Sequence, residues 1–246
     1  MKIRMFASLA VAALLTACGT PSTTQNLGRE NDESHLRVAQ AAAASGDLQL
    51  AESVYANAST AAPSDTTVQL GYADTLLRLN QISQARDVLV SHLQTVREPQ
   101  RLRGPLGAID VLQGNATQAV KELDSAIAGD PGSMRWVVDK AIALDMLGQH
   151  SAAQVLYRKA LADQPDDIIT INDFALSLAL SGQKSEALRI AAPLDEHTDL
   201  PHRVAVTYDV LRAVGGGDVS GGRDSLDPSD HDKVLRLAKA MEDAGH

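Results

Sequence analysis

The chain has 246 residues but a single cysteine and few aromatic side chains. One cysteine cannot form an intramolecular disulfide, so cysteine content says nothing about the redox compartment. Only 3% of the residues are aromatic and alanine is abundant, so each aromatic side chain must fill a large part of its local core. Basic residues are also in the minority, 22 against 31 acidic ones, which gives a formal net charge of -9. This balance argues against nucleic acid and anionic lipid as partners.

Motifs that carry catalysis, nucleotide binding or metal binding are missing as well. The seven histidines are scattered, and there is neither an H-E-x-x-H motif nor a thiol to complete a zinc site. No serine lies in a G-x-S-x-G elbow. The glycines and aspartates of residues 215–228 lack the spacing of a phosphate loop or a calcium loop and indicate a flexible linker. We therefore predict a chain that is not an enzyme and has no cofactor, no metal and no nucleic acid partner.

The N-terminus has the features of a secretory signal. Lys2 and Arg4 precede an apolar run from Met5 to Leu15. This run is shorter than the roughly 20 residues that span a bilayer, which favours a signal peptide over a membrane helix. The run leads into Leu-Thr-Ala-Cys, ending at Cys18. These four residues resemble the bacterial lipobox, in which the cysteine receives a lipid and the preceding peptide is removed.

The lipobox resemblance implies a lipoprotein signal peptide at residues 1–17, lipid attachment at Cys18 and a membrane anchor made of acyl chains. The alternative is an ordinary signal cleaved near Ala17, with an incidental cysteine. Gly19 stands where an aspartate would resemble an inner-membrane retention signal, so we expect the outer membrane, with the protein facing the periplasm. Residues 18–31 are polar and predict a flexible tether.

Small residues recur in the chain every thirty-four positions. The turn positions of this repeat are Gly46, Asn80, Gly114, Gly148 and Gly182, and the positions five residues later are Ala51, Ala85, Ala119, Ala153 and Ala187. Glycine and asparagine tolerate the left-handed conformation that ends a helix. An alanine in the first turns of the next helix lets two helices approach closely. A period of this length predicts stacked helical hairpins, which bind partners more often than they catalyse.

Other positions follow the same period. Larger residues come four positions after the alanine, at Tyr55, Leu89, Leu123 and Tyr157, and small residues come seven positions before each turn, at Ala39, Ala73, Gly107, Ala141 and Ala175. Pro99, Gly104 and Pro105 predict that the first helix of the third unit starts late or is kinked. His202 to Val214 has the pattern of one more first helix.

These spacings resemble the tetratricopeptide repeat family from about Asp32 to Asp199, most strongly from Leu147 to Asp167. The resemblance implies an all-α fold, a right-handed superhelical solenoid of helix–turn–helix hairpins that binds other proteins. We assign residues 32–214 to the solenoid, with about five repeats and a partial sixth helix. We assign residues 229–246 to a C-terminal helix.

The first helices of stacked hairpins line a concave surface, and their inward positions can be counted from the repeat. They predict an acidic groove at the fourth and fifth units, with apolar positions beside it. The candidate partner-binding residues are Asp74, Arg78, Arg135, Asp139, Ile142, Asp145, Met146, Asn172, Asp173 and Leu176. The alternative is an ordinary solvated face. For Trp136, packing between hairpins is favoured over partner contact.

The lipobox, the polar tether and the repeats occur together with the strings ALDMLGQHSAAQVLYRKAL and NDFALSLALSGQ. In combination they resemble the tetratricopeptide lipoproteins of tight-adherence (Flp) pilus loci. The resemblance implies a non-enzymatic, membrane-anchored scaffold for pilus assembly and secretion, whose partners are the secretin or other pilus components. Another tetratricopeptide lipoprotein, such as a type IV pilus secretin pilot or an outer-membrane assembly component, is the alternative. An accessory to an envelope enzyme is a third.

Overall fold

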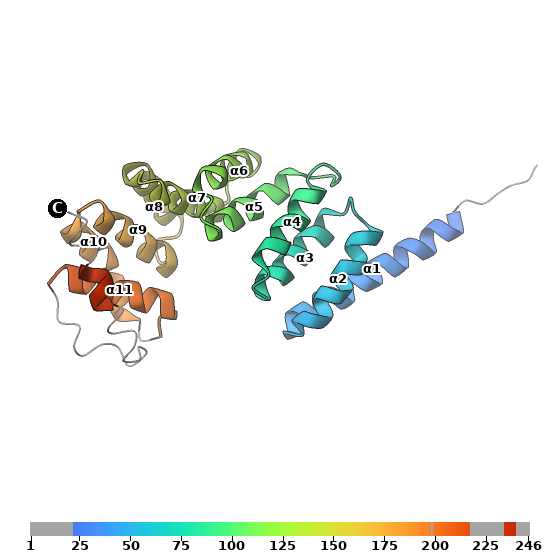
Figure 1. Cartoon of the computed structure of the whole chain (residues 1–246), viewed down its shortest axis with the longest axis horizontal. Coiled ribbons are helices and arrows are strands. Elements are labelled where there is room, and N and C mark those ends of the chain that lie inside the picture. The colour runs from blue at the N-terminus through green and yellow to red at the C-terminus, as the bar shows by residue number, and fades with distance from the viewer. Residues whose placement is uncertain (1–21, 198, 217–233, 240–246) are drawn as a thin grey trace, which may run out of the picture.

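The computed structural model describes residues 22–197, 199–216 and 234–239, and these residues form helices and short turns (Figure 1). The helices are α1 (Ser22–Ser45), α2 (Leu48–Ala61), α3 (Thr66–Arg78), α4 (Ile82–His92), α5 (Gln100–Leu112), α6 (Ala116–Gly129), α7 (Met134–Met146), α8 (His150–Asp163), α9 (Ile168–Leu180), α10 (Lys184–Ala191), the 3₁₀ helix η1 (Ala192–Glu196) and α11 (His202–Val214). Residues 234–239 are also helical. The expected signal peptide, Cys18 and most of the expected linker lie outside the described residues.

Every turn position of the repeat adopts the left-handed conformation. The φ angles are positive at Gly46, Asn80, Gly114, Gly148, Gly182 and Gly216, between 60° and 85°. Each of the first five turns joins the two helices of one hairpin. In the fourth hairpin, the N–H of Gln149 donates to the carbonyl of Leu144 at 2.9 Å, and the equivalent bond recurs at Gln81, Asn115 and Gln183. The left-handed residue and this backward bond together end the first helix and start the second.

The alanines that follow the turns lie in the core. All five of them are buried, as are the residues four positions later, Tyr55, Leu89, Leu123, Tyr157 and Ala191. The odd-numbered helices α3, α5, α7, α9 and α11 contact one another in sequence, as well as their hairpin partners. The hairpins therefore stack into an elongated solenoid whose inner layer is made of first helices (Figure 1). The predicted all-α solenoid of helical hairpins is confirmed.

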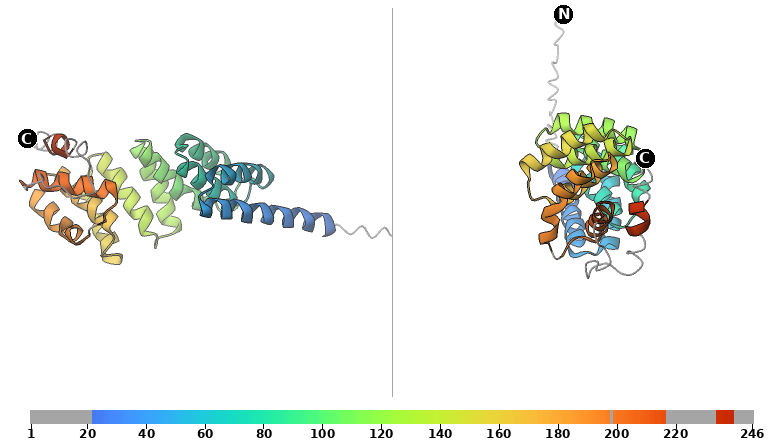
Figure 2. Two further views of the ribbon diagram at one scale, coloured as in Figure 1. Left: turned by 90° about the horizontal axis from the view of Figure 1, so that it is seen from below. Right: turned by 90° about the vertical axis from the view of Figure 1, so that its left-hand side faces the viewer.

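Three local features differ from, or refine, the expectations. Helix α1 begins at Ser22 and projects beyond the first hairpin (Figure 2), so part of the segment expected to be a flexible tether is helical. Helix α5 begins at Gln100, thirty-four residues after α3 begins at Thr66, so the third unit's first helix does not start late. Pro105 lies inside α5, where it removes one backbone donor without ending the helix.

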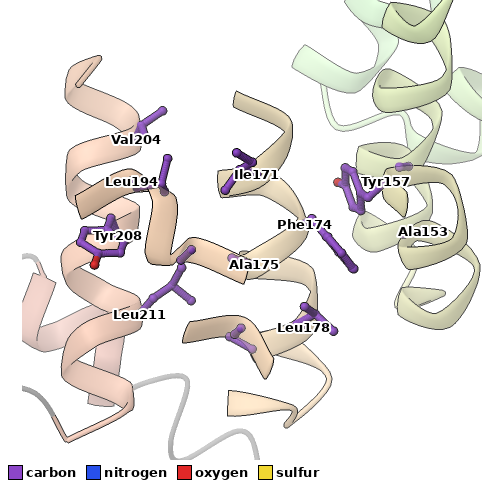
Figure 3. Close-up of a cluster of buried hydrophobic side chains, with 14 of the residues drawn as sticks. Ala153, Tyr157, Ile171, Phe174, Ala175, Leu178, Leu194, Val204, Tyr208 and Leu211 are labelled. Atoms are coloured by element: carbon purple, nitrogen blue, oxygen red, sulfur yellow. The ribbon is translucent and has the colours of Figure 1, made fainter. Parts of the chain in front are cut away.

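The largest core cluster joins the fourth, fifth and partial sixth units (Figure 3). In it, Tyr157 of α8 faces Phe174 of α9, with ring centroids 5.8 Å apart. Helix α11 has the range expected from the sequence and packs on the other side of α9. Val234 and Ala238 of the last helical segment are buried against valines of α11, so this segment docks on the end of the solenoid.

Candidate functional site

A cavity of about 230 Å³ opens between α7, α9 and α11. We call it the Asp173 pocket, and its lining residues are Ile142, Asp145, Met146, Tyr157, Asp173, Leu176, Leu180 and Arg203. Five of the ten predicted groove residues are among them. The structure thus brings together five of the eight predicted groove residues that belong to the fourth and fifth units.

Asp173 lies at the polar end of this pocket and is 5% exposed. Its Oδ1 accepts hydrogen bonds from Nδ2 of Asn172 at 3.0 Å and from Nη1 of Arg203 at 3.2 Å. Its Oδ2 is buried and accepts none from the described residues. Burial raises the pKa of Asp173, and the Arg203 guanidinium partly opposes that rise. Asn172, another predicted groove residue, is itself buried and acts by holding Asp173.

Asp145 lies near the C-terminal end of α7, where the helix dipole disfavours a carboxylate. Three donors compensate for this. Its Oδ1 accepts from Oγ of Ser177 at 2.7 Å and lies 2.8 Å from Nδ1 of His150, and its Oδ2 accepts from the hydroxyl of Tyr157 at 3.1 Å. Burial is the largest cause of a raised pKa at Tyr157, and the negative charge of Asp145 is the second. The phenol therefore stays protonated and remains a hydrogen-bond donor. Asp145 therefore fixes the pocket wall, and neither of its oxygens is left without a donor.

Asp139 and Arg135 line an adjoining cavity of about 290 Å³, together with Asp167. Oδ2 of Asp139 is buried and has no hydrogen-bond partner among the described residues. Burial raises the pKa of Asp139 to about 6, with Arg135 lowering it and the charge of Asp173 raising it further. Asp139 and Asp173 are thus close enough for their charges to repel across the inner surface.

Replacing Asp139 by asparagine should stabilise the protein at pH 7.5 and flatten its pH dependence. A carboxyl whose pKa is raised on folding binds more protons in the folded state, so stability falls as the pH rises from about 4 to about 6. Asparagine does not titrate and so removes that loss. We expect the free energy of unfolding at pH 7.5 to rise by about 1–2 kcal/mol, which is less than the full pKa shift of Asp139 would allow. Urea unfolding at a series of pH values measures both effects.

The matched control is Asp163→Asn, which removes one carboxylate from an exposed position on α8. It should change the unfolding free energy by no more than about 0.5 kcal/mol. If the unfolding free energy of Asp139→Asn varied with pH in the same way as that of the unaltered chain, the raised pKa assigned to the partly buried Asp139 would be contradicted.

The remaining predicted residues lie elsewhere on the solenoid. Asp74 and Trp136 line a separate cavity of about 420 Å³ between the second and fourth units. Nη1 of Arg78 donates to the carbonyl of Ala43 at 2.8 Å and so bridges the first two hairpins. Trp136 is half-buried and has the guanidinium of Arg135 4.8 Å from its ring centroid. The predicted groove is therefore divided into separate cavities.

Three lining residues of the Asp173 pocket, Tyr157, Leu180 and Arg203, are not among the groove residues predicted from the sequence. Tyr157 was predicted only as a position of the repeat. The repeat could have identified Arg203, because Arg203 lies sixty-eight residues, or two repeats, after Arg135 and so occupies the same repeat position. Leu180 is the last residue of α9 and is 48% exposed. Leu180 lies next to the turn, so counting the inward-facing positions of the first helices does not include it.

In the described ranges, no three histidine, cysteine, aspartate or glutamate side chains lie close enough together to hold a metal ion. None of the described helices is long and apolar enough to cross a bilayer.

A stack of helical hairpins with a cavity-bearing inner layer defines a helical repeat protein that offers a surface for binding. A family model described as tetratricopeptide repeat matches residues 42–103 and 111–175, together more than half of the chain. The chain therefore belongs to the tetratricopeptide repeat family. Members of this family typically act as scaffolds for protein–protein interaction, and the matching model indicates no catalytic family.

Comparison with single proteins agrees with this family. The chain is 35% identical over 101 residues to the "Uncharacterized protein y4yS" of Sinorhizobium fredii, and the match covers 41% of this chain and about half, 53%, of that relative. Among solved structures, a tetratricopeptide repeat protein from Parabacteroides merdae is similar with a TM-score of 0.68 at 16% identity, covering 85% of this chain and 84% of that one. MamA from Desulfovibrio magneticus is similar with a TM-score of 0.61 at 15% identity, covering 67% and 93%. At these identities the structures support the fold alone.

Proposed function

We propose that the chain is a lipid-anchored scaffold of the cell envelope whose solenoid holds protein components of a pilus assembly and secretion machine of the tight-adherence (Flp) type. The lipobox ending at Cys18 supports the anchor, and the strings in residues 143–161 and 172–183 support the pilus system. The outer membrane, with the solenoid facing the periplasm, is the proposed location. The partners are the secretin or other pilus components.

The observation that carries the scaffold proposal is the inner surface at the fourth to sixth units. Here the Asp173 pocket combines the partly buried carboxylate of Asp145 and the buried one of Asp173 with the exposed aliphatic side chains of Met146 and Leu180. The mixture of charged and apolar groups in one concave surface is typical of a site that recognises another protein chain.

A photoreactive residue in place of Met146 tests the proposal in cells that carry such a pilus locus. Met146 is 46% exposed at the pocket, whereas Val155 on α8 is 60% exposed and lines none of the cavities described above. We expect the probe at position 146 to crosslink to the secretin or to another pilus component in the membrane fraction. The same probe at position 155 is the matched control and should give no such product.

Three results would count against the proposal. Crosslinking that yields the same products at both positions, or no envelope assembly protein at position 146, contradicts the scaffold role. Recovery of the chain in the soluble periplasm with an unmodified Cys18, measured by mass spectrometry of the mature N-terminus, contradicts the lipid anchor. Crosslinks only to the secretin of a type IV pilus, with none to the tight-adherence system, would favour the type IV pilus secretin pilot instead.

A further inference from the structure

We infer that the Asp173 pocket binds a lysine side chain of the partner protein, presented on a short segment with aliphatic side chains on either side of the lysine. The inference rests on the scaffold function proposed above and gives the chemistry of what the scaffold grips. It follows from four features of the pocket: an unpartnered buried oxygen, the balance of charge, the number of free acceptors and the apolar rim.

The unpartnered oxygen is Oδ2 of Asp173. The side chain of Asp173 is 6% exposed, yet Oδ2 accepts no hydrogen bond from the described residues. Buried polar atoms in folded proteins nearly always have a partner, because leaving one unpaired costs on the order of 1–3 kcal/mol. A carboxylate oxygen kept in this state beside an open cavity indicates a donor supplied from outside the chain.

The balance of charge selects a cation as that donor. Asp139 and Asp167 line the adjoining cavity, and Asp145 and Asp173 line the pocket itself. The arginines that line the two cavities are Arg135 and Arg203, and His150 contacts Asp145. The four carboxylates therefore outnumber these three cationic side chains even when the histidine is protonated. The surface as a whole favours a positively charged ligand group.

The number of free acceptors favours lysine over arginine. A guanidinium binds a carboxylate best through two parallel hydrogen bonds, which require both oxygens. Oδ1 of Asp173 is already occupied by Asn172 and by Arg203. A single free oxygen suits the point charge of an ammonium group. Oδ2 of Asp139, also without a partner among the described residues, is a second acceptor on the same surface.

The rim and the size of the pocket define the rest of the ligand. Met146 and Leu180 are 46% and 48% exposed, and Ile142 and Leu176 are half-buried beside them. These side chains can cover the methylene stem of a lysine and the aliphatic residues next to it. The volume of about 230 Å³ lies below the roughly 300–1,000 Å³ of clefts that enclose small-molecule ligands. The pocket thus fits one long side chain of a protein segment.

The test measures binding of peptides to the full chain purified in detergent. The first peptide, Ser-Gly-Leu-Ile-Lys-Leu-Ile-Gly-Ser, carries the lysine between aliphatic residues. A second has norleucine in place of the lysine, and a third has serine in place of the four aliphatic residues. The unaltered chain should bind the first peptide about tenfold or more tighter than either of the others, as measured by calorimetry, because both the charge pair and the rim are required.

Asp173→Asn should reduce binding of the lysine peptide by about tenfold, because it keeps the shape of the side chain and removes its charge. The same variant should bind the norleucine peptide as the unaltered chain does. Asp163→Asn on the exposed face of α8 is the matched control and should bind the lysine peptide with unchanged affinity. Circular dichroism of each variant verifies that the helices are retained.

The proposal is overturned if the unaltered chain binds the lysine and norleucine peptides equally or binds neither, or if Asp173→Asn binds the lysine peptide undiminished. It is also overturned if Asp173→Asn changes the oligomeric state without any peptide, because the occupant would then be a second copy of the chain. The peptide assay does not depend on location or pilus components. Its failure therefore leaves the crosslinking result of the proposed function standing, and the reverse also holds.

Discussion

Replacing Tyr157 by alanine should destabilise the solenoid by about 3–5 kcal/mol, the range found for truncation of large buried aromatic side chains. Tyr157 is 1% exposed and stacks on Phe174, with ring centroids 5.8 Å apart. Because each hairpin of a solenoid contacts only its neighbours, the loss falls on the packing of α8 against α7 and α9 and leaves the distant hairpins unaffected. Urea unfolding followed by circular dichroism measures the effect.

Tyr157→Phe is the matched control because it keeps the ring and removes only the hydroxyl. Asp145 then loses the donor of its Oδ2, while Ser177 and His150 remain on Oδ1. We expect a cost of about 1–2 kcal/mol, as for one hydrogen bond to a charged acceptor. If phenylalanine proves as costly as alanine, the hydrogen bond and not ring packing stabilises this part of the core, contrary to the prediction.

The repeat could be predicted from sequence because its causes are local. A residue that tolerates a positive φ must stand where each hairpin turns, and Asn80 fills this role with a φ of 60° where the other turns use glycine. An alanine must stand where two helices approach closely, and Ala85 and Ala119 are fully buried for that reason. Pro105 shows the limit of such reasoning, because α5 keeps its position in the repeat despite a proline inside it.

The site could be predicted only in part, because its important contacts join separate units. Counting from the repeat found Asp139 and Asp173 on one surface, but could not show that each keeps one oxygen without a partner among the described residues. The contact between Arg203 and Asp173 spans thirty residues and depends on how α11 packs against α9. Counting inward positions from the repeat also predicted that Asp74 and Arg78 belong to the groove. The stacking of the second hairpin instead places them away from the Asp173 pocket.

The third hairpin contains a glycine that leaves no room for added volume. Gly107 occupies the repeat position that is alanine in the other four units, and a methyl group added there would lie 2.5 Å from Cγ of Leu123. Leu123 is fully buried on α6, and α5 and α6 form the most extensive helix pair of the structure. The third hairpin therefore packs too closely for the methyl group that the other units accept.

Gly107→Ala should therefore destabilise the chain by about 1–3 kcal/mol through overpacking, although alanine is about 1 kcal/mol better than glycine inside a helix. Leu123→Ala alone should cost about 2–5 kcal/mol by leaving a cavity. In the Leu123→Ala background the clash is gone, so Gly107→Ala should there be neutral or stabilising by up to about 1 kcal/mol. Urea unfolding of the four chains of this double-mutant cycle measures the coupling between the two positions. If the two changes in the free energy of unfolding were additive, the added methyl group would not contact Leu123. Glycine at position 107 would then not be explained by the close contact of α5 with α6.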